Sequence, residues 1–385
     1  MKLLHTFKLS PVESPPHVRE LREEVRAFLD VELEGISPVS RAKSWFGFDP
    51  DFSRKLGARG WIGMTWPKVF GGHERPAIDR YVVIEELLAA GAPVGAHWIA
   101  DRQSGPLIMK FGSDAAKSAF LPKITKGERF FCIGMSEPNA GSDLAAIETS
   151  AERTADGWIV NGSKLWTTNI EHSHQMIALV RTDRSHSSRH GGLSQFIIDL
   201  SAPGVTRRAI EDHQREKHFG EVHFQDVFVP DEMVVGEPGQ GWAQVNAELA
   251  LERSGPERYL SSHRVFEEFV RSNRNCEDSD ITRLVGELTA RLWTLRQMSQ
   301  SVARHVEEGD NPTLEAAIVK DLGATFEQDL PVLIQSALNE SGHRPSDPQL
   351  KDVMEYLLLL SPAFSLRGGT REILRGIISR EIGLR

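Results

Sequence analysis

Apolar residues recur at helical spacing through the first third of the chain. After Ser14-Pro15, a pair typical of a helix cap and first turn, one face of the predicted helix carries Val18, Leu21, Val25, Phe28 and Leu29. Two further helices are predicted over residues 82–90 and 114–127. The pattern therefore predicts a helical domain.

The pattern changes near residue 130, where short β-type runs alternate with turn residues. The predicted strands are residues 157–160, 176–180, 195–198, 221–224 and 227–229. The stretch Arg181–Gly192 is polar and rich in histidine, which is typical of an exposed loop. Short strands separated by turns favour a compact antiparallel β domain, built as a barrel or a sandwich.

Helical spacing returns beyond Gly241. A long apolar stripe predicts one helix through Ile281, Leu284, Val285, Leu288, Leu292, Leu295, Met298 and Val302. A second helix starts at Asn311-Pro312, and its predicted inward residues are Leu314, Ile318, Leu322 and Phe326. Residues 351–360 and 370–382 supply more helix, which together predicts a four-helix-type bundle.

The order of these elements predicts an α+β fold with three domains. The expected domains are an N-terminal helical domain over residues 1–130, a central antiparallel β barrel or sandwich over 131–236, and a C-terminal four-helix-bundle domain over 237–385. The length of 385 residues agrees with two or three domains of roughly 150 residues each.

Composition narrows the class of protein. The 45 basic and 54 acidic side chains give a net charge of −9 without a long basic block, which argues against nucleic-acid binding. The two cysteines, Cys132 and Cys276, exclude a disulfide scaffold. Because the first ten residues lack the apolar core of a signal peptide, and no run of about 18 apolar residues predicts membrane insertion, we expect a cytoplasmic protein.

Two patterns that can mark cofactor or metal sites have plainer interpretations here. The Gly-rich stretch 236–241 has the wrong order for a dinucleotide fingerprint and predicts a turn that enters a helix. The histidines that lie close in sequence have no carboxylate or thiol support, so we expect a solvated loop and no metal site at His172, His174, His186 and His190.

Two segments of the β domain have the chemistry to bind a cofactor. The loop Ser136–Asp143 combines an irregular backbone with the Ser142 hydroxyl, which suits pyrophosphate binding through N–H groups. In the stretch 164–169, Trp166 is placed to cover a flat heteroaromatic ring and Thr168 to hydrogen-bond it. Taken singly, a capping loop and a core aromatic at a strand end explain these segments at least as well.

The stretch 249–258 contains a candidate base. Glu252 follows an apolar turn, and burial of its carboxylate would raise the pKa and make it a better base. A surface pair of Glu252 and Arg253 is the alternative interpretation.

The stretch 367–375 has the pattern of a turn that runs into the last helix. Gly368 and Gly369 allow the backbone to approach a ligand closely, and Thr370 is placed to cap the helix. A simple helix start is the alternative interpretation.

Together these segments resemble the acyl-CoA dehydrogenase family over most of the chain. They are similar to its N-terminal signature, its Thr/Ser-Glu-Pro-x-Ala-Gly-Ser-Asp loop, its Trp-x-Thr-Asn strand, its β-to-helix junction and its C-terminal helix entry. In family order they are Leu56–Pro67 with Gly71-Gly72, Ser136–Asp143, Trp166–Asn169, Val227–Pro230 with Gly239–Trp242, and Gly368–Ile373.

The resemblance implies an FAD flavoprotein of fatty acid or lipid catabolism that oxidises an acyl-CoA thioester to its 2-enoyl form. The residues it implies along the flavin and its phosphates are Ile133, Met135, Ser136 and Ser142, with Trp166 and Thr168 beside the isoalloxazine and Thr370 and Glu372 reaching the cofactor from the last helix. The residues it implies for the CoA arm are Ser142, Arg253 and Arg380.

The chain departs from the common family pattern at three places. Gly368 stands where most members carry the catalytic Glu, so the resemblance to the isovaleryl-CoA dehydrogenase subset implies Glu252 as the base. The Arg-x-x-Phe-Gly segment is replaced around Arg271–Asn275, and the Gln-x-x-Gly-Gly-x-Gly loop by Gln335–Gly342. Both missing segments contact the adenine end of FAD in the family, which raises the chance of a hetero-oligomer.

The resemblance also implies partners and leaves alternatives open. An electron-transfer flavoprotein would receive the electrons, and the chain would form a homo- or hetero-tetramer or dimer. The alternative functions are an FAD-bearing subunit of a heteromeric acyl-CoA dehydrogenase and a related flavin monooxygenase or oxidase. The shift of the base to Glu252 favours a branched or bulky acyl group, because it leaves room near Gly368.

Overall fold

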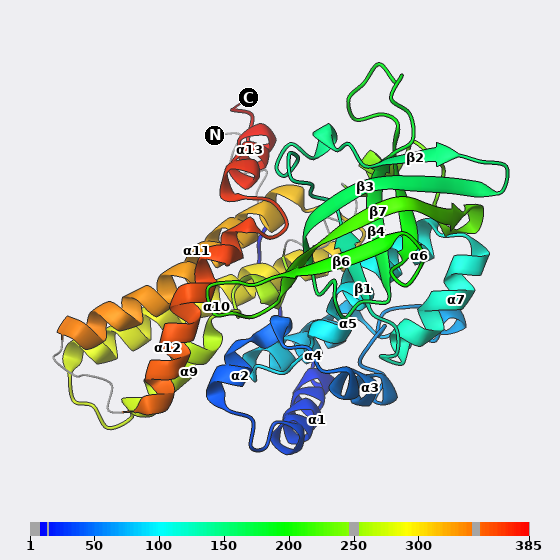
Figure 1. Ribbon diagram of the computed structural model, residues 1–385. Coiled ribbons are helices and arrows are strands. Elements are labelled where there is room, and N and C mark those ends of the chain that lie inside the picture. The colour runs from blue at the N-terminus through cyan, green and yellow to red at the C-terminus, as the bar shows by residue number, and fades with distance from the viewer. Residues whose placement is uncertain (1–7, 14, 246–253, 341–346, 385) are drawn as a thin grey trace. The chain divides into compact units, whose positions relative to one another are not determined.

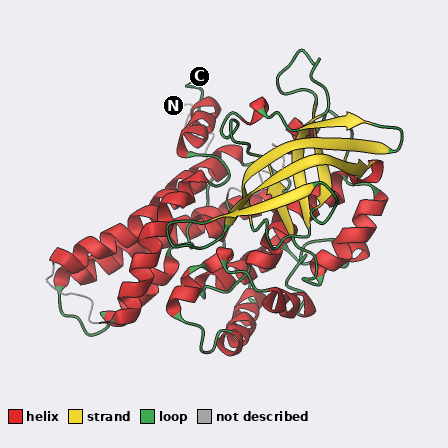
Figure 2. Cartoon of the chain, in the orientation of Figure 1, coloured by secondary structure: helices red, strands yellow, loops and turns green. Residues whose placement is uncertain are grey.

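A computed structural model describes residues 8–13, 15–245, 254–340 and 347–384. Within these ranges helices come first, strands occupy the middle and helices return (Figures 1 and 2). This order confirms the predicted α+β fold. Contacts divide the chain into a helical unit (Met1–Gly47, Arg75–Pro93 and Glu252–Arg385) and a β-containing unit (Phe48–Glu74 and Val94–Leu251).

The helical unit combines the first helices of the chain with those that follow the strands. Its α-helices are α1 (His17–Glu32), α2 (Pro38–Ala42), α4 (Ala77–Ala89), α9 (His263–Ser272), α10 (Ser279–Glu307), α11 (Thr313–Glu340), α12 (Pro348–Leu360) and α13 (Arg371–Glu381). Its short 3-10 helices are η2 (Ser44–Phe46), η7 (Pro256–Arg258) and η8 (Ser361–Leu366). The long helices α10 and α11 run side by side (Figure 1). Among the described helices, none is long and apolar enough to cross a membrane.

The buried faces of these helices confirm most of the predicted apolar stripes, with one correction. All five predicted inward residues of α1 are buried, as are Ile281 and Leu288 of α10. On α11, however, Leu322 is 47% exposed. The prediction was wrong because the buried face of this helix carries Lys320 and Glu327, both fully buried, which a search for apolar residues passes over.

The β-containing unit packs helices beside one sheet. Its helices are α3 (Pro50–Ala58), η3 (Lys68–Phe70), α5 (Gly95–Ile99), the π-helical turn η4 (Ala100–Ser104), α6 (Gly105–Phe111), α7 (Asp114–Thr125), η5 (Leu144–Ala146) and η6 (Asp231–Met233). Its strands are β1 (Phe131–Gly134), β2 (Ser150–Arg153), β3 (Gly157–Thr168), β4 (Gln175–Arg181), β5 (Leu193–Asp199), β6 (Val205–Ile210), β7 (Phe219–Pro230) and β8 (Val234–Val235).

The strands form an eight-stranded sheet in the order β6-β7-β3-β2-β4-β5-β8, with β1 beside β4. Most pairs are antiparallel, as predicted, whereas β1 and β2 each pair with β4 in parallel. The two predicted strands at 221–224 and 227–229 are one continuous strand, β7. Side chains such as Trp158 of β3 and Phe196 of β5, with ring centroids 5.4 Å apart, form a common core.

Candidate functional site

A strip of incompletely buried side chains runs along the end of β1 and the end of β3. Ile133 and Met135 are half-buried, while their neighbours Cys132 and Gly134 are buried. This alternation follows from the two-residue period of a strand. The sheet therefore presents one face of β1 outward, where the sequence predicted flavin contacts.

Trp166 is exposed at a bulge near the end of β3. Lys164 pairs with Val222 and Thr167 with Gly220, so Leu165 and Trp166 together face a single residue of β7. Such a bulge re-aims the side chains on its strand. Trp166 has a φ of 60° and its side chain is 58% exposed.

The bulge holds the loop that follows β1. The Leu165 N–H donates to the Ser136 carbonyl at 2.8 Å. The Lys164 ammonium donates to the Met135 carbonyl at 3.2 Å. Met135, Ser136 and Trp166, predicted from separate motifs, are therefore brought together by two hydrogen bonds.

The loop 136–143 is closed at its base and open at its tip. The N–H groups of Glu137 and Ala140 each donate to the other's carbonyl, at 2.8 and 3.1 Å. Ser142 and Asp143 are exposed, and Asp143 pairs with Arg189 of the histidine-rich loop. His190 of that loop stacks on Trp242, with ring centroids 4.3 Å apart. This arrangement leaves the Ser142 hydroxyl on the surface, available to a ligand.

A buried ion pair beneath the loop was missed by the sequence reasoning. Lys164 is fully buried, and its Nζ lies 2.7 Å from Oε1 of Glu137. Burial lowers the pKa of Lys164 to about 8, against the opposing charge of Glu137. Burial also acts to raise the pKa of Glu137, but the Lys164 charge and the Glu148 N–H outweigh it, so the pKa is lowered. The sign of this ion pair in the sequence was Lys164 itself, a charged residue that lies between the buried residues Val160 and Thr167 of β3.

Asn169, the last residue of the Trp-x-Thr-Asn segment, contacts a helical part of the same unit. Its amide Nδ2 donates to the Gly95 carbonyl at 3.2 Å, and Asn169 itself is buried. Its φ of 57° lies in the left-handed region, which Asn tolerates better than most residues. Asn169 therefore ties the end of β3 to the start of α5. Thr168, one residue earlier, stays half-buried.

The helical unit carries the remaining predicted cofactor residues at the start of α13. Gly368 and Gly369 have φ values of 62° and 99°, which only glycine adopts readily. The buried Lys320 donates to the Gly369 carbonyl at 2.7 Å and so holds this turn. Thr370 is the N-cap residue, but its side chain makes no capping bond to the helix backbone, which corrects the prediction.

The Thr370 hydroxyl instead bonds the carboxylate of Glu372. The Glu372 N–H and this bond lower the pKa of the Glu372 carboxylate, which places a negative charge at the start of α13. Arg380 is exposed in the last turn of the same helix. Glu252 and Arg253 lie outside the described residues, so the predicted base and its neighbour stay predictions.

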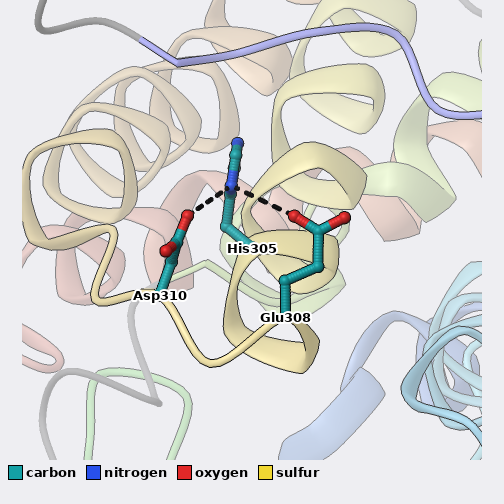
Figure 3. Close-up of side chains that lie close together, drawn as sticks. All are labelled: His305, Glu308 and Asp310. Atoms are coloured by element: carbon teal, nitrogen blue, oxygen red, sulfur yellow. Dashed lines mark hydrogen bonds and ion pairs between the residues drawn. The ribbon is translucent and has the colours of Figure 1, made fainter.

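One group of potential metal ligands occurs in the part of the chain that the structure describes. His305, Glu308 and Asp310 each offer a ligand atom within 4.8 Å of the others (Figure 3). Nδ1 of His305 lies 3.1 Å from the Asp310 carboxylate, while Nε2 lies 2.7 Å from the Lys8 carbonyl. Because Arg304 also donates to Glu308 at 2.9 Å, the group is an ion-pair cluster at the end of α10.

Comparisons with known proteins point to one family. Residues 15–128 match the model of the acyl-CoA dehydrogenase N-terminal domain, and residues 132–227 match that of the acyl-CoA dehydrogenase middle domain. The chain is 31% identical to acyl-CoA dehydrogenase IpdE1 of Mycobacterium tuberculosis over 378 residues, which cover 95% of this chain and 97% of that protein.

Two solved structures illustrate the similarity in fold. One is the Tcur3481-Tcur3483 steroid ACAD, with a TM-score of 0.86, 27% identity, and coverage of 97% of this chain and 98% of that chain. The other is the ChsE4-ChsE5 complex from Mycobacterium tuberculosis, with a TM-score of 0.80, 28% identity, and coverage of 96% and 98%.

Proposed function

The chain belongs to the acyl-CoA dehydrogenase family and is an acyl-CoA dehydrogenase, and we propose that it binds FAD along β1 and β3 and oxidises a bulky, ring-bearing acyl-CoA. Members of this family use FAD. The similar Tcur3481-Tcur3483 protein is a steroid ACAD, which supports a steroid-derived acyl group as the substrate class.

The observation that carries the FAD proposal is the outward strip on β1 and β3. Its half-buried Ile133 and Met135 offer an apolar surface, and the 58% exposed Trp166 offers an aromatic one. Large exposed aromatic side chains usually mark a binding surface. Thr168 adds a hydroxyl and Ser142 lies on the exposed loop, so the strip fits a flat heteroaromatic ring with a phosphate tail.

The reaction needs a base, a grip on the thioester carbonyl and a hydride acceptor. Bound FAD would supply the acceptor for the hydride that leaves the β carbon. Glu252 would take the α proton, and the electron pair of that C–H bond would form the new double bond. A backbone N–H of the Gly368 turn, held by Lys320, would donate to the oxygen on which charge develops.

The Gly368 turn supports a base elsewhere in the chain. Gly368 has no side chain, and its φ of 62° places the position in a conformation that favours glycine. The carboxylate of Glu327 is paired with Arg367 at 3.0 Å. Glu252, which lies two residues before the described segment that begins at Ser254, remains the proposed base.

An anaerobic flavin-bleaching screen tests the proposed function. We expect the purified protein, supplied with FAD, to show the spectrum of oxidised flavin and to lose that absorbance when a steroid-like acyl-CoA is added. Bulky ring-bearing thioesters should bleach it faster than straight short-chain ones. Bleaching by none of a short, branched, long and steroid-like series would contradict catalysis by this chain. Rapid return of the flavin absorbance when oxygen is admitted to the bleached protein would favour the oxidase alternative.

We also propose that the chain works as a homo- or hetero-oligomer and passes electrons to an electron-transfer flavoprotein. Large apolar side chains on the helical unit are exposed, among them Trp293 (60%), Leu359 (53%) and Leu366 (67%). Exposed apolar side chains of this size would lose contact with water if a partner covered them. Similar solved structures include a complex of two chains, the ChsE4-ChsE5 complex.

FAD occupancy is expected to follow oligomeric state. The Arg271 that replaces the missing family segment is held by Glu268 and Asp347, so it is already neutralised within this chain. A partner would then have to complete the adenine end. Light scattering combined with FAD titration should show full occupancy only in species heavier than the 43.0 kDa chain. A monomer that holds stoichiometric FAD would contradict this prediction.

A further inference from the structure

The pair of Lys164 and Glu137 lies directly behind the strip proposed to bind FAD. Lys164 is on β3, two residues before Trp166, and Glu137 follows Ser136 in the loop after β1. Both side chains are buried, at 0% and 8% exposure. A buried charge lowers the stability of the fold unless it is paired and hydrogen-bonded. Folding therefore has to remove both ions of this pair from water, which costs free energy.

The hydrogen bonds of Glu137 hold it in one orientation. Its Oε2 accepts the Glu148 N–H at 2.6 Å, and its Oε1 accepts the Thr149 N–H at 3.0 Å. Oε1 also accepts the Lys164 ammonium at 2.7 Å. The carboxylate therefore fixes the ammonium from one side, since the two backbone donors leave it little freedom to move.

The lysine stem also has a defined path. A Cβ added at Gly134 would lie 3.1 Å from Cγ of Lys164 and 2.3 Å from Sδ of Met176, so glycine there leaves room for the stem. At its end, the ammonium donates to the Met135 carbonyl at 3.2 Å. The lysine therefore crosses from β3 to the backbone that follows β1.

This contact determines where the next amide points. In a trans peptide the carbonyl and the N–H lie on opposite sides of the bond, and the described chain has no cis peptide. Because the Met135 carbonyl points to the buried ammonium, the Ser136 N–H of the same peptide points away from it, toward the outward face. Among the described residues, no acceptor for that N–H is present, whereas the Ser136 carbonyl accepts from Leu165.

Resting on the FAD site proposed above, we propose that Lys164, held by Glu137, is a positioning residue that aims the Ser136 N–H at the bound flavin. The same lysine precedes the bulge that turns Trp166 outward. One buried cation therefore fixes both the direction of the Ser136 N–H donor and the position of the Trp166 ring at the flavin site. Neither Lys164 nor Glu137 touches the flavin. A donor fixed in advance binds better than one that must be ordered on binding.

Two single variants and one double variant test this positioning role. Lys164→Met keeps the stem and removes the cation, Glu137→Gln keeps the shape and removes the anion, and the double variant removes both charges. The double variant should restore much of the thermal stability lost by each single one, because no unpaired buried charge remains. FAD affinity should stay reduced by about tenfold or more in Lys164→Met and in the double variant, as for loss of a charge-assisted hydrogen bond.

The readout is the dissociation constant of FAD, measured by flavin fluorescence, beside the melting temperature of the apoprotein. Arg208→Met is the matched control, because it removes an exposed cation of the same sheet that lies 3.6 Å from Glu221. The control should bind FAD as the unaltered protein does. Recovery of both stability and FAD affinity in the double variant would overturn the proposal and leave the pair a structural one.

A pH series on the unaltered protein gives a test that needs no variant. Burial lowers the pKa of Lys164 to about 8, against the opposing charge and hydrogen bond of Glu137. FAD affinity should therefore fall as the pH rises through about 8, because the neutral amine donates a weaker bond. Affinity that stays flat from pH 7 to 9 would overturn the proposal. Failure of the unaltered protein to bind FAD at any pH would instead contradict the proposed function.

Discussion

Glu252→Gln is expected to lower the rate of flavin reduction by acyl-CoA at least ~100-fold, the lower end for loss of a general base. Glutamine keeps the size of the side chain and its ability to hydrogen-bond, but it cannot take up the α proton. Binding of FAD and of acyl-CoA should therefore survive. Stopped-flow absorbance of the flavin measures the step directly, and a titration with a non-reducing acyl-CoA analogue measures binding separately.

Glu237→Gln is the matched control for this substitution. Glu237 is exposed in the Gly-rich turn before residue 241, so the same chemical change there should leave flavin reduction unaltered. If Glu252→Gln reduces flavin near the rate of the unaltered protein, the base lies elsewhere and the proposed proton transfer is wrong. Loss of FAD binding together with turnover would point to a folding effect.

Arg367→Met is expected to lower the free energy of unfolding by about 3–5 kcal/mol, as for a buried ion pair that loses one partner. Nη2 of Arg367 lies 3.0 Å from Oε2 of Glu327, and the guanidinium also lies 4.6 Å from the Trp45 ring centroid. Glu327 is fully buried, so the substitution would leave its charge without its cation. Urea unfolding at pH 7 measures the loss.

The loss in Arg367→Met should depend on pH. Burial raises the pKa of Glu327 above its ordinary value of 4.5, against the opposing charge of Arg367. Without Arg367 the pKa rises further, so the folded variant holds a proton that the unfolded chain releases above pH 4.5. The free energy of unfolding of the variant should therefore fall from pH 5 to pH 7, and the gap to the unaltered protein should widen.

Two further proteins separate this ion pair from general damage. Glu327→Gln with Arg367→Met removes both charges and should recover part of the lost stability. Arg283→Met removes an exposed cation of α10 that pairs with Glu287 at 3.1 Å, and it should leave the unfolding midpoint unchanged. A loss in Arg367→Met that is equal at pH 5 and pH 7 would contradict the assignment to Glu327.

Local sequence was sufficient to predict the helices and strands whose buried face is apolar. The stripe of Val18, Leu21, Val25 and Phe28 predicted α1, because helix periodicity alone places these residues on one side. The same reasoning failed for Leu322. The buried face of α11 includes Lys320 and Glu327. Lys320 bonds the Gly369 carbonyl, 49 residues away, and Glu327 pairs with Arg367, 40 residues away.

The residues of the candidate site also fall into those that the sequence predicted and those that only the structure revealed. The motifs around Ser136, Trp166 and Gly368 could be recognised in the sequence, because each needs only neighbouring residues and a backbone that bends locally. The role of Lys164 could not, since its Glu137 partner is 27 residues away and its Met135 contact depends on how β1 packs beside β3. Periodicity and turn chemistry are properties of neighbours along the chain, so the sequence by itself determined the order of elements and the family. The pairing of buried charges depends on distances across the fold, and only the tertiary structure decided it.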